Sequence, residues 1–257
     1  MKKDLLGLVI THAHEDHIGA IADLWPRLKC PVYATQFAVS LLETRRLSEP
    51  GAPDVPLHVV AQGSRITLGP FDIEFVPVSH SVPESNALAI RTPAGLVMHT
   101  GDWKRDPTPV IGLPTDEKRL REIGDEGVLA LVCDSTNIRR EGESPSEADV
   151  AIGLRDVISK ATGRVVVTTF ASNVARLRSV AEAAVACGRT VVTVGRAMER
   201  TIQVAREIGY LDGLPGFLSP QAYSALTRDK ILILATGSQG EPRAALARIA
   251  ADEHPEV

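Results

Sequence analysis

The fold of this chain is decided by the stretch Thr11-His12-Ala13-His14-Glu15-Asp16-His17-Ile18-Gly19-Ala20. It places three imidazoles and two carboxylates within six consecutive residues. An apolar run over residues 5–10 leads into it and predicts a buried strand, and residues 18–28 predict a helix. Neutral imidazoles and carboxylates are the ligands of zinc, iron and manganese in proteins. The stretch therefore predicts a metal site.

The spacing within this stretch divides its side chains between two ions. His12 and His14 are two residues apart, so on extended backbone they point the same way and can bind one ion. Asp16 and His17 follow at the turn into the predicted helix, where they reach a second ion. The alternative is a polar loop with surface histidines. The chain has 7 histidines and three of them fall here, which favours the metal site.

Two later strand ends offer further ligands. Residues 71–78 alternate apolar and polar side chains, a strand pattern, and are followed by a loop that contains His80. Residues 95–100 form another strand pattern that leads to Asp102. We assign His80 to the ion bound by the first two histidines, and Asp102 as a carboxylate that bridges both ions. Taken alone, a histidine such as His80 is more often an ordinary loop residue than a ligand, and Asp102 alone could be a turn residue after glycine.

The order of four segments resembles that of the metallo-β-lactamase superfamily: THAHEDHIGA at 11–20, SHSVPES at 79–85, HTGDWKRD at 99–106 and CDSTN at 133–137. More narrowly, the chain resembles the ribonuclease J family of the β-CASP branch. The segments at 132–137, 169–173 and 236–241 recur in that family in this order and spacing. The resemblance covers essentially the whole chain.

The strand and helix patterns agree with the fold that this resemblance implies. Short strands interrupted by helices over residues 1–143 suit a truncated metallo-β-lactamase αββα sandwich. Residues 144–257 alternate strand and helix, which predicts a parallel α/β (Rossmann-like) β-CASP domain. Its first helix should start at Ser146, with Asp149 at the spacing of a capping box.

The resemblance implies a metal-dependent RNA phosphodiesterase. Two Zn²⁺ ions, with Mn²⁺ or Mg²⁺ as alternatives, would clamp the scissile phosphate and activate a water. The expected metal ligands are His12, His14, Asp16, His17, His80 and Asp102. The expected catalytic residues are Asp16, Asp102 and Asp134, although Asp134 is equally placed to cap the turn that follows it. The implied action is 5′-to-3′ exonucleolytic on single-stranded RNA, with endonuclease action left open.

Two polar turns of the second domain are candidate phosphate sites. Both follow predicted strands, and ligands of parallel sheets bind at the carboxyl edge of the strands. Hydroxyls and helix N-terminal N–H groups there suit an anion, so Ser172, Asn173 and Ser238 are the expected substrate-binding residues. The alternative is ordinary N-capping by the same side chains.

Composition limits the other functions. With 44% apolar and 23% charged residues the chain can build a core, and a net charge of −4 argues against a broadly basic surface without excluding a local basic channel. The three cysteines, expected in the core, form no CxxC pair and favour a reducing, cytoplasmic location. The chain has no apolar run long enough to span a membrane.

The chain departs from the resembled family at both ends, so we expect a fragment whose second metal group lacks a ligand and which is inactive by itself. A homo-oligomer of the full-length protein stays open. The alternatives to a ribonuclease are a hydrolase of another ester or amide on the same fold, and an RNA-binding fragment with an incomplete metal centre.

Overall fold

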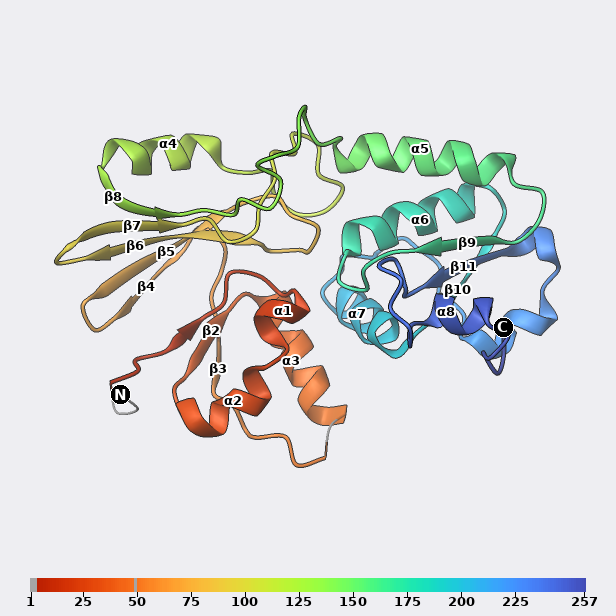
Figure 1. Cartoon of the computed structure of the whole chain (residues 1–257), viewed down its shortest axis with the longest axis horizontal. Helices are drawn as coiled ribbons and strands as arrows, with labels where there is room; N and C mark the ends of the chain where they lie inside the picture. The colour runs from red at the N-terminus through yellow and green to blue at the C-terminus, as the bar shows by residue number, and fades with distance from the viewer. Residues whose placement is uncertain (1–3, 49) are drawn as a thin grey trace. The chain divides into compact units, whose positions relative to one another are not determined.

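The computed structural model describes residues 4–48 and 50–257 (Figure 1). The chain divides into two compact units, Met1–Pro145 and Ser146–Val257. This division lies close to the boundary after residue 143 that the sequence predicts.

The first unit starts with a small parallel sheet in the order β1 (Leu8–Val9), β2 (Val32–Ala34), β3 (Leu57–Val59). The connections are α1 (Glu15–Ile18), α2 (Ile21–Leu28) and α3 (Gln36–Ser48). The prediction of one helix over 18–28 is wrong, because the chain breaks between α1 and α2 at Gly19 and Ala20. The predicted buried strand over 5–10 is also too long, since Leu5 and Leu6 are exposed.

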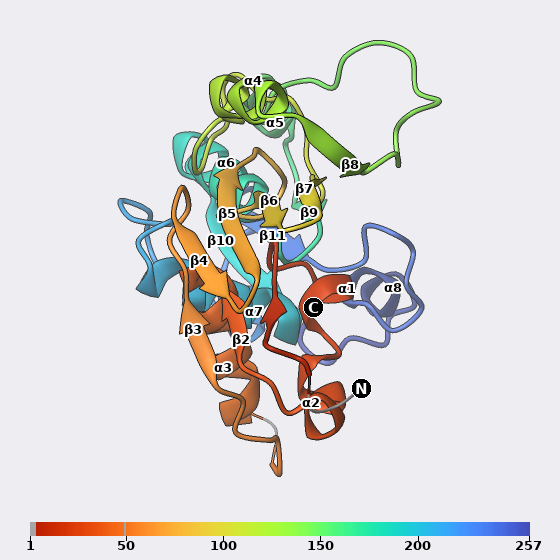
Figure 2. The same ribbon diagram turned by 90° about the vertical axis from the view of Figure 1, so that its left-hand side faces the viewer.

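The second sheet has five strands in the order β4 (Arg65–Leu68), β5 (Phe71–Pro77), β6 (Asn86–Thr92), β7 (Gly95–His99), β8 (Val128–Val132). The first four are antiparallel, whereas β8 pairs parallel to β7 after α4 (Glu117–Asp125). Figure 2 shows β4 and β8 at opposite edges. The sequence analysis did not predict β8.

Two apolar layers confirm the αββα sandwich. Alternate residues of β5 face opposite sides. Ile73 and Phe75 pack with Val9 and Tyr33 of the first sheet and with Leu88 of β6, which forms the layer between the sheets. The opposite face of the second sheet packs on α4 through Val76, Val78, Ala87, Ala89, Leu96, Met98 and Ile123.

The second unit starts at the predicted capping box. The Ser146 hydroxyl accepts from the Asp149 N–H at 3.0 Å, and the Asp149 carboxylate accepts from the Ser146 N–H at 3.3 Å. This pair begins α5 (Glu147–Lys160). Three all-parallel strands follow, in the sheet order β10 (Thr190–Val194), β11 (Ile231–Ala235), β9 (Val165–Thr168), as the alternation of elements predicts.

Helices cover this sheet. Ile231, Ile233 and Ala235 of β11 pack with α8 (Ala245–Ala250) through Ala245 and Ile249. The remaining elements are α6 (Val174–Ala186), α7 (Arg196–Glu207) and the 3₁₀ turns η1 (Pro220–Ala225) and η2 (Arg228–Lys230). β9 and β11 are parallel neighbours, so the loops 169–173 and 236–244 leave the same edge of the sheet.

Two predictions from composition have outcomes in the structure. Cys30 is buried, but Cys133 is exposed, so its expected place in the core is wrong. Within residues 4–48 and 50–257, none of the helices combines the length and apolar character needed to cross a membrane.

Glu74 is a buried carboxylate that joins three strands and a helix. Its oxygens accept from Arg65 of β4 at 2.8 Å, Arg91 of β6 at 2.9 Å and Arg119 of α4 at 2.6 Å. The Arg119 hydrogen bond is the largest of the causes that lower the pKa of Glu74 to about 2. The network therefore fixes α4 over the second sheet.

We predict that Glu74→Gln destabilises the first unit by about 1–3 kcal/mol, since each hydrogen bond to a charged group contributes about that much. Because the folded pKa lies below the unfolded one, this stabilisation is present above about pH 4.5 and is lost as the pH falls toward 2. Denaturant unfolding at several pH values measures it. The control is Glu122→Gln, which removes an exposed partner of Arg119 and should cost less than about 1 kcal/mol. Equal effects of the two variants at pH 7 would contradict the prediction.

Candidate metal centre

The candidate ligands come from loops that follow three strands of the first unit. His12 and His14 lie between β1 and α1, His80 lies in the loop between β5 and β6, and Asp102 follows β7. The two sheets are joined at this point, because the Asn86 backbone N–H at the start of β6 donates to the Thr11 carbonyl at 3.0 Å. The fold thus brings residues distant in the sequence to one place.

The first group holds four candidate ligand atoms. His12, His14, His80 and Asp102 each offer one atom, and these atoms lie within 4.8 Å of one another. His80 Nε2 is 3.1 Å from His14 Nδ1. The Asp102 carboxylate oxygen Oδ2 is 3.7 Å from His12 Nε2 and 3.9 Å from His80 Nε2. The structure therefore gathers the set of ligands that the sequence assigns to one ion.

The second group shares Asp102 with the first. Asp16, His17 and Asp102 also offer atoms within 4.8 Å of one another. His17 Nε2 lies 3.6 Å from the same Asp102 oxygen that faces the first group, and 3.7 Å from Asp16 Oδ2. Asp16 is largely exposed, whereas Asp102 and His17 are half-buried. A carboxylate that bridges two ions must lie within reach of the other ligands of both, and Asp102 lies within reach of both groups.

Burial keeps the histidines of the first group neutral. Desolvation, followed by the neighbouring imidazoles of His17, His14 and His80, lowers the pKa of His12 to about 2. Desolvation and then His14 lower the pKa of His80 to about 3, and desolvation also lowers that of His14. An imidazole binds a metal only when it is unprotonated. The cluster therefore offers free lone pairs at neutral pH.

The donor set fits a metal ion. His12 Nε2 is buried without a hydrogen-bond partner among the described residues, although such atoms in proteins are normally satisfied. Zn–N bonds of about 2.0–2.1 Å in tetrahedral geometry place ligand atoms about 3.3 Å apart. Three donor pairs of this group are 3.1 to 3.9 Å apart, and all four donors lie within 4.8 Å of one another. Imidazole and carboxylate donors suit zinc and also manganese.

Two hydroxyls hold the ligand rings, and the sequence analysis gave them no role. Thr11 Oγ1 lies 2.9 Å from His12 Nδ1, and Ser81 Oγ lies 3.1 Å from His14 Nε2. In each ring the second nitrogen faces the cluster. In the sequence, Thr11 directly precedes His12 and Ser81 directly follows His80. This adjacency to a ligand histidine is the signal by which the sequence could have identified them.

Asp134 lies outside both groups. Its carboxylate accepts from the Thr136 N–H at 2.9 Å, and its own N–H donates to the Thr100 hydroxyl. Burial raises its pKa, but hydrogen bonds from Thr136 and the Trp103 backbone and the charge of His80 outweigh burial and lower it. Asp134 therefore caps its turn and is also close enough to His80 to interact with it.

The three candidate substrate-binding residues differ in whether they cap a helix. Asn173 is the N-cap of α6, where its side-chain oxygen accepts from the Arg176 N–H at 3.0 Å. Ser172 precedes this cap and is half-buried, and Ser238 is exposed in the loop after β11. α8 is capped at Ala244, so Ser238 is not its N-cap.

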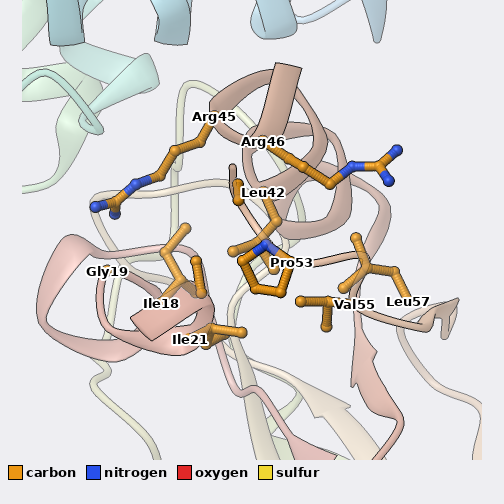
Figure 3. A pocket seen from close by; sticks show the side chains of 11 residues that line it. Ile18, Gly19, Ile21, Leu42, Arg45, Arg46, Pro53, Val55 and Leu57 are labelled. Atoms are coloured by element: carbon orange, nitrogen blue, oxygen red, sulfur yellow. The ribbon is translucent and has the colours of Figure 1, made fainter. Parts of the chain in front are cut away.

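An apolar pocket lies among α1, α2, α3 and the segment that leads into β3. Figure 3 shows the side chains of Ile18, Ile21 and Leu42 on its walls. Arg45 at its rim forms an ion pair with Glu15 of α1 at 2.8 Å. The pocket is lined by Ile18, Gly19, Ile21, Ala22, Leu42, Arg45, Arg46, Ala52, Pro53, Val55 and Leu57. Its lining includes no candidate ligand, so this hollow is separate from the metal centre.

Comparison with known proteins gives two family matches. The beta-lactamase superfamily domain matches residues 2–113, and the "Ribonuclease J, beta-CASP domain" matches residues 162–257. A crystal structure of a protein of unknown function from Enterococcus faecalis V583 is similar in fold, with a TM-score of 0.63 and 16% identity. The match covers 91% of this chain and 59% of that one.

Several curated proteins named Ribonuclease J are similar in sequence. The one from Sinorhizobium meliloti is 54% identical over 98% of this chain and 45% of its own length. Those from Corynebacterium glutamicum and Helicobacter pylori are 44% and 40% identical over 97% and 99% of this chain, but 35% and 37% of their own lengths. The chain thus spans less than half the length of these relatives.

The first unit, an αββα sandwich with a histidine–aspartate cluster at its strand ends, matches the beta-lactamase superfamily domain. The matches of the second unit and of the curated relatives are more specific: over 98% of its length the chain is similar to a protein of the ribonuclease J family.

We predict that Asp102→Asn weakens zinc binding at both groups, because Asp102 belongs to both. Even residues that only support a ligand contribute roughly 10- to 100-fold in metal affinity, so the loss should be at least that large. Asp16→Asn, which alters only the more exposed group, should leave the tighter ion in place. Chelator competition and elemental analysis after dialysis measure this. The wild-type chain should retain clearly fewer than two tightly held ions, and unchanged retention in Asp102→Asn would contradict the assignment.

Proposed function

We propose that this chain contributes the metal centre of a zinc-dependent ribonuclease that hydrolyses phosphodiester bonds of single-stranded RNA in the 5′-to-3′ direction. The observation that carries the proposal is the position of Asp102, whose Oδ2 atom lies 3.6 to 3.9 Å from the Nε2 atoms of His12, His17 and His80. A shared carboxylate between two ligand groups suits a pair of ions, and the relatives named Ribonuclease J supply the substrate class.

In the proposed hydrolysis, the histidines and Asp102 bind the metal ions, and Asp134 supports them. When bound, a pair of zinc ions supplies hydroxide at neutral pH and polarises a phosphoryl oxygen. His12 and His80 are neutral imidazoles, each with one nitrogen lone pair free for a metal, because burial holds the pKa of each ring far below neutral. Asp102 places one carboxylate within reach of both groups. Asp134, whose pKa is lowered, stays ionised and close to His80, where it supports that ring or accepts a proton.

The test of the function uses the full reading frame that carries this sequence. With zinc or manganese, 5′-monophosphorylated single-stranded RNA should release mononucleotides, and Asp102→Asn should reduce the rate at least roughly 100-fold, as loss of a charge-stabilising group does. Release of internal fragments would add endonuclease action. Hydrolysis of a chromogenic lactam or a thioester without RNA hydrolysis would instead favour the other hydrolases of this fold. The 257-residue chain alone should show no processive hydrolysis, because among the described residues its second group has three candidate ligands, one of them exposed.

For the second unit we propose that Ser172, Asn173 and Ser238 bind a nucleotide phosphate. Ser172 and Ser238 leave the carboxyl edge of neighbouring parallel strands, where ligands of such sheets bind. Ser238 is exposed and is not a helix cap, so capping does not explain it.

We predict that Ser172→Ala and Ser238→Ala weaken RNA binding several-fold, with a smaller dependence of affinity on salt, while the melting temperature stays unchanged. Asn173→Ala should in addition destabilise the unit by about 1 kcal/mol, because it removes the cap of α6. Fluorescence anisotropy with labelled RNA and thermal unfolding separate the two effects. Unchanged RNA affinity in both serine variants would refute the phosphate site.

A further inference from the structure

The loop that carries His80 also supports a different ligand. Ser81, the next residue, places its hydroxyl oxygen 3.1 Å from Nε2 of His14. The other nitrogen of the same ring, Nδ1, lies 3.1 Å from His80 Nε2. One nitrogen of His14 therefore faces the candidate ion site and the other faces Ser81.

This loop is anchored at several points. Glu84 adopts a left-handed backbone conformation with φ 58°, which is uncommon for a residue with a side chain. Its carboxylate accepts from the Phe37 N–H at the start of α3 at 2.8 Å. The Asn86 side chain donates to the Glu84 carbonyl at 2.7 Å, and the Ser85 hydroxyl donates to the Val82 carbonyl at 3.1 Å. Ser81 is thus presented by a fixed segment.

The chemistry of a ligand histidine gives this contact a role. A neutral imidazole has one N–H and one lone pair, and only the nitrogen with the lone pair binds a metal. Histidine ligands in proteins usually donate their other N–H to an oxygen, which fixes both the tautomer and the ring orientation. The Ser81 hydroxyl is the oxygen that meets Nε2 of His14.

We propose that Ser81 is a positioning residue that holds the proton of His14 on Nε2 and leaves the Nδ1 lone pair directed at the ion shared with His80. Thr11 occupies the corresponding place at Nδ1 of His12, so that ring is held with Nε2 toward the cluster. The inference rests on the proposed metal centre, to which it assigns the binding nitrogen of each ring.

The first test uses the metal-free chain and needs no activity. Long-range ¹H–¹⁵N spectra of ¹⁵N-labelled protein report the tautomer of each histidine. His14 should be protonated at Nε2 in the wild type and in Ser81→Thr, which retains the hydroxyl. In Ser81→Ala it should populate both tautomers. A pure Nδ1-protonated His14 in the wild type, or an unchanged tautomer in Ser81→Ala, would overturn the proposal.

The second test measures zinc affinity by competition with a chromogenic chelator. Ser81→Ala should weaken the tighter ion roughly 10- to 100-fold, and Ser81→Thr should restore most of it. The matched control is Ser85→Ala, which removes a buried hydroxyl of the same loop that donates to the Val82 carbonyl, and it should change zinc affinity less than about threefold. Equal losses in Ser81→Ala and Ser85→Ala would mean a general effect on the loop and would overturn the specific role. If the wild type binds no zinc, the metal centre is wrong, while the tautomer spectra still decide whether Ser81 orients His14.

Discussion

The structure around the histidine-rich stretch depends on the cost of burying imidazoles next to one another. Burial and mutual repulsion oppose protonation of His12, His14 and His80, and they lower the pKa of each ring. A cluster of neutral imidazoles contributes little to folding by itself, and within the part of the chain that the structure describes His12 Nε2 has no hydrogen-bond partner. Such an arrangement is explained by an ion that all these donors can share.

The fold places this cluster where rigid elements end. The histidine-rich stretch follows β1 of the small parallel sheet, while the loops with His80 and Asp102 follow β5 and β7 of the five-stranded sheet. The Asn86 to Thr11 backbone hydrogen bond joins the two sheets beside the ligands. On the far face of the five-stranded sheet, the three arginines around Glu74 fix α4. The ligand positions therefore follow from strand pairing and packing, which is how a rigid fold supports a precise site.

Much of this was predictable from local sequence patterns. The spacing of His12 and His14, the strand ends before His80 and Asp102, and the Ser146 capping box each depend on a few neighbouring residues, and the structure has them as expected. The break between α1 and α2 was missed because the sequence at Gly19 and Ala20 has no proline or side-chain cap that would mark it. β8 was missed because its exposed apolar residues form no alternating pattern. The role of Ser81 depends on a contact between residues 67 positions apart, which no local pattern reveals.

X-ray absorption spectroscopy of the chain loaded with one equivalent of zinc tests the central claim most directly. The account predicts only nitrogen and oxygen neighbours, at about 2.0–2.1 Å, with the outer-shell scattering of about three imidazoles, as expected from His12, His14 and His80. A sulfur neighbour at about 2.3 Å, or a shell of oxygens without imidazole scattering, would contradict it.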